Sequence, residues 1–216
     1  TVKHFRDDYL AYLRGERKVK KAKGYHAKLT APCMDRCPAH IDIPTYIEEI
    51  KDYRHDESLA TIRDYMPIAA VCGRVCPHPC ESACRRALVD EPVSIMVLKR
   101  VASDHEWLHN HTPPMQPKPS TGKRVMVVGA GPAGLTTAYY LALEGHQVKI
   151  IDMLHEPGGT VAVGIPDYRM PRDLLQREAD IITALGVEIE YGVKLGRGSA
   201  PHYLFRAKAY DNRVNG

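Results

Sequence analysis

A glycine-rich turn between a strand-like and a helix-like segment limits the possible folds of this chain more than any other feature. The pattern is G-x-G-x-x-G, and its residues are Gly129, Gly131, Pro132, Ala133 and Gly134. The first glycine permits a tight turn, the second lets the backbone approach a pyrophosphate, and the third lets the helix pack closely on the strand. The phosphates then meet the free N–H groups and the positive dipole end of the helix N-terminus. The motif predicts a dinucleotide-binding βαβ unit; the alternative is a βαβ unit whose glycines are only structural.

The segments around this turn alternate between strand and helix patterns. We expect strands over residues 124–128, 147–151 and 187–191, and helices over 132–144 and from Pro171 to Gly186. The first of these strands is a short apolar run of the kind found in buried parallel strands. Gly145 follows the first helix as a stop signal. Together the segments predict a Rossmann-like α/β fold.

An acidic residue follows the second expected strand. Asp152 stands 18 residues after Gly134, which is close to the spacing of the acid that hydrogen-bonds a ribose hydroxyl in dinucleotide-binding folds. Gly158 and Gly159 come shortly afterwards, and such a glycine pair suggests backbone packed closely against a second part of the ligand. The glycine motif and the acid alone do not separate NAD from FAD.

Six cysteines form two groups earlier in the chain. The spacings are C-x3-C-P for the first group and C-x3-C-P-x2-C-x3-C for the second, at Cys33, Cys37, Cys72, Cys76, Cys80 and Cys84. Zinc sites favour C-x2-C pairs, whereas cysteine followed by proline recurs in iron–sulfur proteins. Four thiolates suffice for one [4Fe–4S] centre, and six are too few for two all-cysteine centres. The pattern therefore favours iron–sulfur ligation over unligated buried thiols.

The region that carries the cysteines has helical patterns. Pro44 opens one expected helix, whose inner face carries Tyr46, Ile47 and Ile50. Asp56 caps a second expected helix, in which Leu59, Ile62 and Arg63 follow. Pro92 opens a third, which carries Ile95, Leu98, Val101 and Ala102 on one side. A proline-rich connector then separates this region from the α/β segments. We expect a fold of class α + α/β, in which a helical domain precedes an incomplete Rossmann-like domain. The expected divisions are a basic arm over 1–30, the helical domain over 31–112, a linker over 113–122, the α/β domain over 123–196 and an unassigned tail over 197–216.

Charge and hydropathy exclude some classes of protein. Residues 1–30 hold nine Lys/Arg and three Asp/Glu, a balance of +6, so the remainder of the +4 chain has a balance of −2. This arm is expected to be solvated rather than a strip for an acidic partner, and no stacking aromatics support nucleic-acid binding. No apolar run is long enough to cross a membrane and the start resembles no signal peptide, so we expect a cytoplasmic protein. His105 and His109 are four residues apart, and we expect helix-end solvation there rather than a metal site.

Several of these motifs together resemble one known family. The segments are Cys33 to Pro44, Val71 to Cys84, Val125 to Leu135, Pro157 to Gly159 and Gly164 to Arg169. They are similar to the glutamate synthase small-subunit family, which includes the N-terminal half of dihydropyrimidine dehydrogenase. The resemblance covers about residues 31–196. It implies a helical domain with [4Fe–4S] clusters, an FAD domain, and a nested NAD(P)H domain that has no counterpart in this chain. Electrons would pass from the nicotinamide through FAD to the clusters and on to a partner subunit.

The resemblance also implies roles for individual residues. Cys37, Cys76 and Cys80 would share one cluster, and Cys33 and Cys84 would belong to another. The family's opening cysteine pair, expected just before Cys33, is absent, so one or two clusters remain possible, and Cys33 or Cys84 could complete a single one. The family's non-cysteine ligand position falls near Lys99, whose ammonium cannot ligate iron, and Cys72 has no role in the family pattern.

These observations predict the front part of an FAD- and iron–sulfur-dependent NAD(P)H oxidoreductase. The resemblance implies no catalytic acid or base. Two alternatives remain open. One is a non-catalytic docking module with an empty nucleotide fold, and the other is a zinc-stabilised nucleic-acid binder that uses the basic arm.

Overall fold

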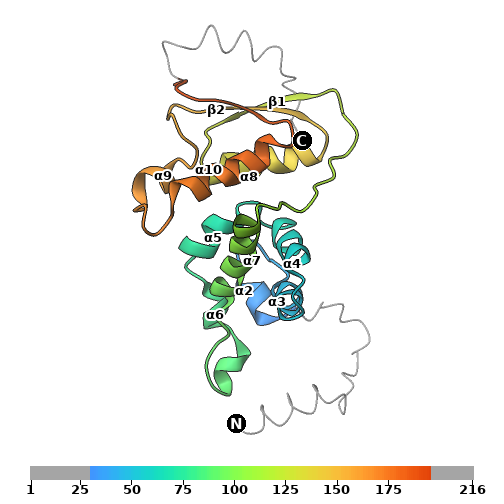
Figure 1. Cartoon of the computed structure of the whole chain (residues 1–216), viewed down its shortest axis with the longest axis vertical. Helices are drawn as coiled ribbons and strands as arrows, with labels where there is room; N and C mark the ends of the chain where they lie inside the picture. Colours follow the sequence, from blue (N-terminus) through green and yellow to red (C-terminus); the bar gives the residue numbers. More distant parts are fainter. Residues whose placement is uncertain (1–29, 196–216) are drawn as a thin grey trace.

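The computed structural model describes residues 30–195, and Figure 1 shows a helical half stacked against an α/β half. The expected tail over 197–216 and all of the expected basic arm except Thr30 lie outside this described part. The expected class, a helical domain joined to part of a Rossmann-like fold, is confirmed. Within the described part, no helix is both long enough and apolar enough to span a membrane.

The helical half consists of short helices around a small core. Its elements are α2 (Pro32–Arg36), α3 (Ile43–Lys51), α4 (His55–Arg63), α5 (Ala69–Val75), α6 (Pro79–Ser82), the 3-10 turn η1 (Arg85–Leu88) and α7 (Ile95–His109). Helix α3 begins as expected: Pro44 lies in its first turn, and the Asp42 carboxylate accepts a hydrogen bond from the Thr45 N–H at 3.3 Å. Tyr46 on this helix is buried, and its hydroxyl donates to the Ile95 carbonyl at 3.0 Å. This bond fixes α3 against the start of α7.

Three details of the expected helices are wrong. Asp56 does not cap α4, because Arg54 is the N-cap and Asp56 lies in the first turn, where its carboxylate pairs with His111. Pro92 does not open α7, which begins at Ile95 after an extended segment. Val101 is 40% exposed rather than inward-facing. The buried polar residues Lys99, Ser103 and Glu106 occupy part of the inner face of α7. The spacing of apolar residues in the sequence could not reveal this.

The α/β half follows the expected order closely. Its elements are β1 (Arg124–Val128), α8 (Pro132–Leu143), β2 (Gln147–Ile151), α9 (Thr160–Gly164), α10 (Arg172–Thr183) and β3 (Glu188–Glu190). The strands are parallel in the order β1-β2-β3. Gly145 and Gly186 follow α8 and α10 with φ of +84° and +87°, a left-handed conformation that glycine adopts without a steric cost. In the α/β half of residues 30–195, α9 is the one element that was not expected.

Strand β1 is less buried than its apolar run suggests. It forms one edge of the sheet, where only β2 pairs with it, and Val128 at its end is 62% exposed. Figure 1 shows α8 and α10 together beneath the sheet, between it and the helical half. A strand needs neighbours on both sides and both faces to be fully buried, and the described residues supply only some of these.

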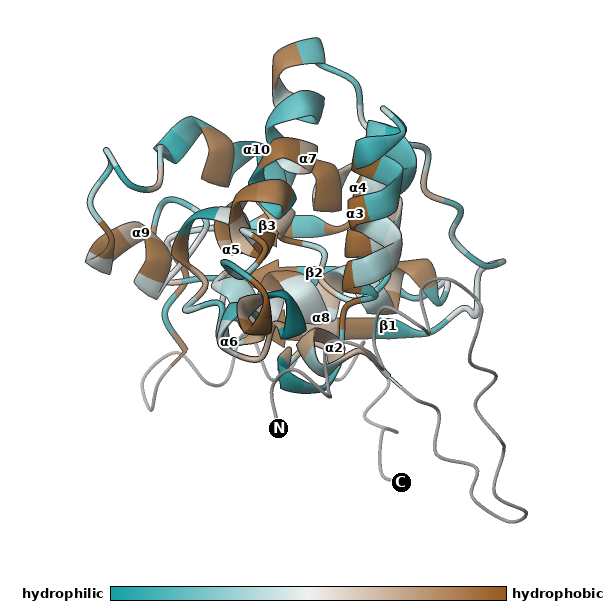
Figure 2. Cartoon of the chain, turned by 90° about the horizontal axis from the view of Figure 1, so that it is seen from below, coloured by the Kyte–Doolittle hydropathy of each residue, from teal (hydrophilic) through white to brown (hydrophobic). Residues whose placement is uncertain are grey.

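The apolar residues form two cores. One lies within the helical half around Tyr46, Leu59 and Ile62. The other is centred on α8, α10 and the sheet, but it also contains Ile68 and Val71, which belong to the start of α5. Figure 2 shows the corresponding pattern of brown and teal segments along the helices. The second core therefore continues from the α/β half into the helical half.

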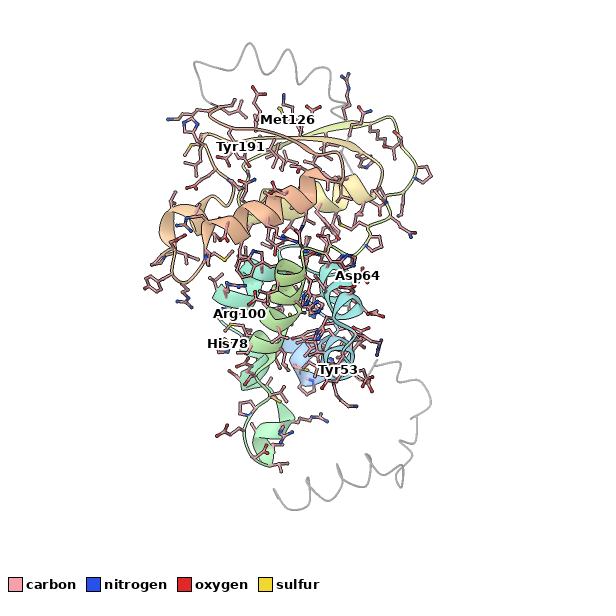
Figure 3. All side chains as sticks on the ribbon, in the orientation of Figure 1. Tyr53, Asp64, His78, Arg100, Met126 and Tyr191 are labelled. Atoms are coloured by element: carbon pink, nitrogen blue, oxygen red, sulfur yellow. The ribbon has the colours of Figure 1, made fainter. Side chains whose placement is uncertain are left out.

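A polar contact at the junction adds to this packing. The Tyr140 hydroxyl on α8 donates to the Asp64 carbonyl at the end of α4, at 3.2 Å. Asp64 is labelled in Figure 3, where it lies at the top of the helical half, beside α8 and α10. Residues 110–123, which contain the proline-rich connector, link the halves without helix or strand.

Candidate functional site

The glycine-rich turn has the geometry that its sequence predicts. Gly129 has φ +98°, and its N–H donates to the Ile151 carbonyl at 2.7 Å, which holds the turn against the end of β2. Gly131 is the N-cap of α8. A Cβ at Gly134 would collide with the Gly129 carbonyl oxygen, so only glycine allows this close approach of helix and strand. The predicted binding of a phosphate group at the N-terminus of α8 is compatible with this geometry and stays a prediction.

The second glycine pair packs against the first turn. The Gly158 N–H donates to the Ala130 carbonyl at 2.8 Å, and a Cβ at Gly158 would collide with the Leu175 side chain. A Cβ at Gly159 would lie 3.0 Å from the Cα of Gly131. These glycines bring two backbone turns together at the carboxyl ends of β1 and β2, the edge where dinucleotides bind in folds of this type.

Asp152 lies next to the same turn. Its carboxylate is buried, and Oδ2 accepts from the Ala130 N–H at 2.5 Å while Oδ1 accepts from the Leu154 N–H at 2.7 Å. The residue thus ties the end of β2 to the glycine turn. Each oxygen has a further lone pair, so the predicted contact with a ribose hydroxyl is compatible with these bonds and stays a prediction.

The cysteines lie on the short helices of the helical half and at their ends. Cys33 lies in α2 and Cys37 at its C-cap, Cys80 lies in α6, Cys84 precedes η1, and Cys72 and Cys76 lie in α5 and at its C-cap. Helix α2 packs on α6, and all six thiols are free. His78, labelled in Figure 3, lies between α5 and α6 in the chain, and its backbone N–H donates to the Cys76 sulfur at 3.3 Å.

The thiols influence one another electrostatically. Burial raises the pKa of Cys80 to about 11, and the charges of Cys37 and Cys76 raise it further, against the effect of Lys99. Burial also raises the pKa of Cys33, where the neighbouring charges are those of Cys84 and Cys37. Cys37 thus influences both Cys80 and Cys33, and the two ligand sets that the family resemblance implies stay a prediction.

Cys72, for which sequence reasoning found no role, is influenced by two of the same thiols. Burial raises its pKa to about 11, Lys99 opposes this shift, and the charges of Cys76 and Cys37 add to it. Lys99 on α7 is only 6% exposed, which is rare for an ammonium group without anionic neighbours. The position where the family has a non-cysteine ligand is therefore filled by a buried cation beside thiols.

Several features of these side chains suit an iron–sulfur cluster. Among residues 30–195, no three His, Cys, Asp or Glu side chains stand close enough to hold one ion. A [4Fe–4S] cluster instead separates its ligands, because each binds a different corner iron. Thiols from several short helices, an N–H donor to one sulfur and a buried cation are features that suit such a cluster.

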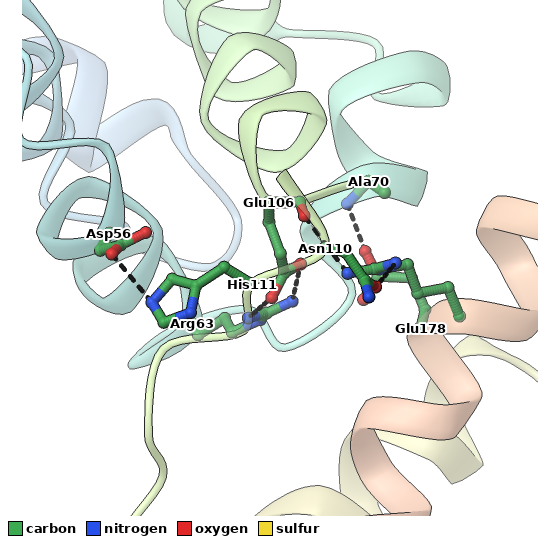
Figure 4. Close-up of polar contacts among 8 residues, drawn as sticks. Asp56, Arg63, Ala70, Glu106, Asn110, His111 and Glu178 are labelled. Carbon is green, nitrogen blue, oxygen red and sulfur yellow. Dashed lines mark hydrogen bonds and ion pairs between the residues drawn. The ribbon is translucent and has the colours of Figure 1, made fainter. Parts of the chain in front are cut away.

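Sequence reasoning missed a polar network where the halves meet, shown in Figure 4. Arg63 of α4 and Glu106 of α7 form two hydrogen bonds of 2.7 Å, and both side chains are 4% exposed. Arg177 of α10 donates to the Glu106 carbonyl at 3.2 Å and to Asn110 at 3.0 Å. Glu178 of the same helix accepts from the Ala70 N–H at the start of α5. The sequence pattern that could have revealed this network was a charged residue on the inner face of an expected helix. Glu106 is such a residue, because it stands four positions after Ala102 and therefore on the same face.

Histidines form a stack beside this network. The rings of His55 and His105 are 4.3 Å apart, and those of His105 and His109 are 4.1 Å apart. Burial, and then the charges of His55 and His109, lower the pKa of His105. His109 also contacts the His105 carbonyl through Nδ1 at 2.8 Å. His55 was the member that the sequence pattern did not reveal, because it lies fifty residues earlier on α4.

Comparison with known proteins agrees with both halves. Residues 2–111 match the family model described as dihydropyrimidine dehydrogenase domain II, 4Fe-4S cluster, and residues 127–185 match a model described as NAD(P)-binding Rossmann-like domain. The first match includes the basic stretch as well as the cysteines. The expected resemblance to the N-terminal half of dihydropyrimidine dehydrogenase is thereby confirmed.

The chain is also similar to named oxidoreductase subunits. It is 63% identical over 199 residues to the NADPH-Fe(3+) oxidoreductase subunit beta of Geobacter sulfurreducens, covering 91% of this chain and 30% of the relative. It is 47% identical over 193 residues to the NADP(+)-dependent formate dehydrogenase subunit beta of Moorella thermoacetica, covering 80% and 27%. It is 37% identical over 169 residues to the NAD-dependent dihydropyrimidine dehydrogenase subunit PreT of Escherichia coli, covering 77% and 41%. The chain thus spans about a third of the length of these relatives.

Proposed function

Because the chain belongs to the dihydropyrimidine dehydrogenase domain II, 4Fe-4S cluster family, we propose that it carries electrons between NAD(P)H, FAD and an iron–sulfur cluster in a larger oxidoreductase. One observation carries the proposal: a cysteine-rich half and a dinucleotide-type glycine turn share a continuous core through the start of α5. Helix α5 also bears Cys72 and leads directly to Cys76. The two candidate cofactor sites are thus parts of one folded unit.

Each half would bind its own cofactor. The FAD-binding residues would be Gly129, Gly131, Pro132, Ala133, Gly134, Asp152, Gly158 and Gly159, and the cluster ligands would be drawn from Cys33, Cys37, Cys76, Cys80 and Cys84. When bound, FAD supplies the step between two-electron and one-electron transfer. The N-terminus of α8 would bind the pyrophosphate and Asp152 the ribose, while the thiolates hold the cluster.

The remaining parts of the proposal concern the larger protein. NAD(P)H would bind through a domain outside this chain, and a partner subunit would receive the electrons, as in enzymes of glutamate synthase small-subunit type. The related subunits named above are beta subunits or subunits of assemblies, which supports a partner. Residues 31–112 and 123–196 would act as the two domains, with 113–122 as their linker.

Cofactor stoichiometry tests this function. The 216-residue chain would be purified without oxygen and analysed for iron, acid-labile sulfide and flavin released by denaturation. We expect equal iron and sulfide, broad absorbance near ~400 nm from the cluster, and FAD fluorescence after release. Protein with neither iron and sulfide nor flavin would contradict the proposal, and a cluster without flavin would favour the docking-module alternative.

A further inference from the structure

Cys72 has no role in the family pattern, but its position in the fold gives it one. We propose that Cys72 is the fourth thiolate of the cluster held by Cys37, Cys76 and Cys80, and that Lys99 is the buried cation that balances the charge of this centre. The proposal rests on the proposed function, because it requires that the chain holds an iron–sulfur cluster. It assigns a ligand at the point where the family's own fourth ligand is missing.

The first argument is the placement of Cys72 on α5. Cys72 lies in the helix and Cys76 is its C-cap residue, four positions later. Side chains four residues apart project from the same face of a helix, one turn from each other. If Cys76 is a ligand, as its spacing implies, the Cys72 thiol points to the same side of α5.

The second argument is the packing of α5 on α7 beside Cys72. A Cβ at Gly73, the residue after Cys72, would lie 2.9 Å from the Cα of Arg100, the residue after Lys99. Cys72 and Lys99 therefore stand on two helices whose backbones approach closely. The electrostatic influence of Cys37, Cys76 and Lys99 on both Cys72 and Cys80 agrees with this placement.

The third argument is the burial of Lys99. An ammonium group has no lone pair to offer iron, so the residue at the family's ligand position cannot replace that ligand. Removing such a cation from water is costly unless an anion lies beside it. A cluster with four thiolates carries net negative charge, and Lys99, on the helix that packs against α5 at Gly73, would offset that charge.

These roles are chemically consistent with each other. Each thiol loses its proton to solvent when it binds iron, and a nearby cation favours the thiolate form. Cys72 also packs against the core shared with α8 and α10, so this ligand would place one corner of the cluster on the side of the nucleotide-binding half.

Cysteine substitutions in the full chain test the ligand assignment. Cys72→Ser would be compared with Cys80→Ser, a substitution of a proposed ligand, and with the wild-type chain after anaerobic cluster reconstitution, by iron and sulfide content and by electron paramagnetic resonance. We expect both variants to fall from about four irons per cluster to about three or none. Wild-type iron content and signal in Cys72→Ser would overturn the assignment.

A second measurement does not depend on whether Cys72→Ser folds. Alkylation of the wild-type chain would be mapped by mass spectrometry with the cluster in place and after its removal by a chelator. Cys37, Cys72, Cys76 and Cys80 should be protected from alkylation only while the cluster is bound. Equal reactivity of Cys72 in both states would contradict its role as a ligand.

The role of Lys99 has its own test. Lys99→Met removes the charge and keeps a similar apolar volume, so we expect the same iron content but a more negative reduction potential, because the reduced cluster loses a neighbouring cation. An unchanged potential would refute the charge-balancing role. A wild-type chain without iron and sulfide would instead contradict the proposed function itself, so the two failures are distinguishable.

Discussion

Glu178 of α10 accepts a hydrogen bond from the backbone N–H of Ala70 in the first turn of α5, with 2.5 Å between Oε1 and the nitrogen. The glutamate is buried, and its second oxygen has no hydrogen-bond partner among the described residues. A carboxylate is favoured at this end of a helix, where backbone N–H groups lack partners. Through this bond a helix of the nucleotide-binding half holds the helix that leads to the cysteines.

The protonation of Glu178 should make stability depend on pH. Burial raises its pKa from 4.5 to about 7, so the folded state binds a proton between these values that the unfolded state has released. Stability should therefore fall as pH rises through this window, by up to ~3 kcal/mol. Glu178→Gln should remove this dependence while it keeps an acceptor for the Ala70 N–H. Chemical denaturation of both proteins between pH 4.5 and 7 measures the difference, and parallel curves would contradict the prediction.

Removing one member of the buried Arg63–Glu106 pair should be strongly destabilising. Either partner alone leaves a buried charge without its counter-ion, at a cost of about 3–5 kcal/mol. Glu106→Gln should therefore lower the denaturation midpoint markedly. Asp90→Asn is a matched control, because it removes a carboxylate that pairs with Arg86 at the exposed surface. Similar denaturation midpoints for the two variants would show that the buried pair contributes no more to stability than the exposed pair.

A methyl group at Gly134 should disrupt the glycine turn. The added Cβ would collide with the Gly129 carbonyl oxygen, and forcing α8 away from β1 should cost about 1–3 kcal/mol. We expect Gly134→Ala to lose flavin binding and to melt at lower temperature. Gly164→Ala serves as the control, because a Cβ there meets nothing within 4 Å. Flavin content equal to that of the wild type in Gly134→Ala would refute the predicted role of the turn.

The histidine stack should weaken the fold in mild acid. Burial and the neighbouring His55 and His109 lower the pKa of His105 below its ordinary 6.5, so the unfolded state binds a proton first. Stability should be full above pH 6.5 and decrease as pH falls through the lowered pKa. Asp56 and His111 also face this ring: Asp56 raises the pKa of His105 and His111 lowers it, and both effects are smaller than those of burial, His55 and His109. His105→Gln should have a flatter stability profile below pH 6.5 than the wild type or His155→Gln, a control outside the stack, and an equally steep profile would contradict this.

Sequence reasoning was correct where a structural feature depends only on residues that are neighbours in the chain. The strand, turn and helix around Gly129 to Gly134 were predictable because the glycines serve backbone geometry within a short segment. The positive φ angles of Gly145 and Gly186 likewise followed from helix ends. The start of α7 was misplaced by three residues, since Pro92 lies in an extended segment and does not itself begin the helix.

The sequence by itself determined the fold class and the two kinds of candidate site. Glycine spacing and cysteine spacing are properties of neighbouring residues, and their chemistry can be read from the chain. The tertiary structure alone decided that α5 beside Cys72 packs on α7 beside Lys99 and that Glu178 reaches the start of α5. These partners are tens of residues apart along the chain, and only helix packing brings them together. Burial then gives such contacts their strength, because a charge or thiol removed from water responds strongly to each neighbour.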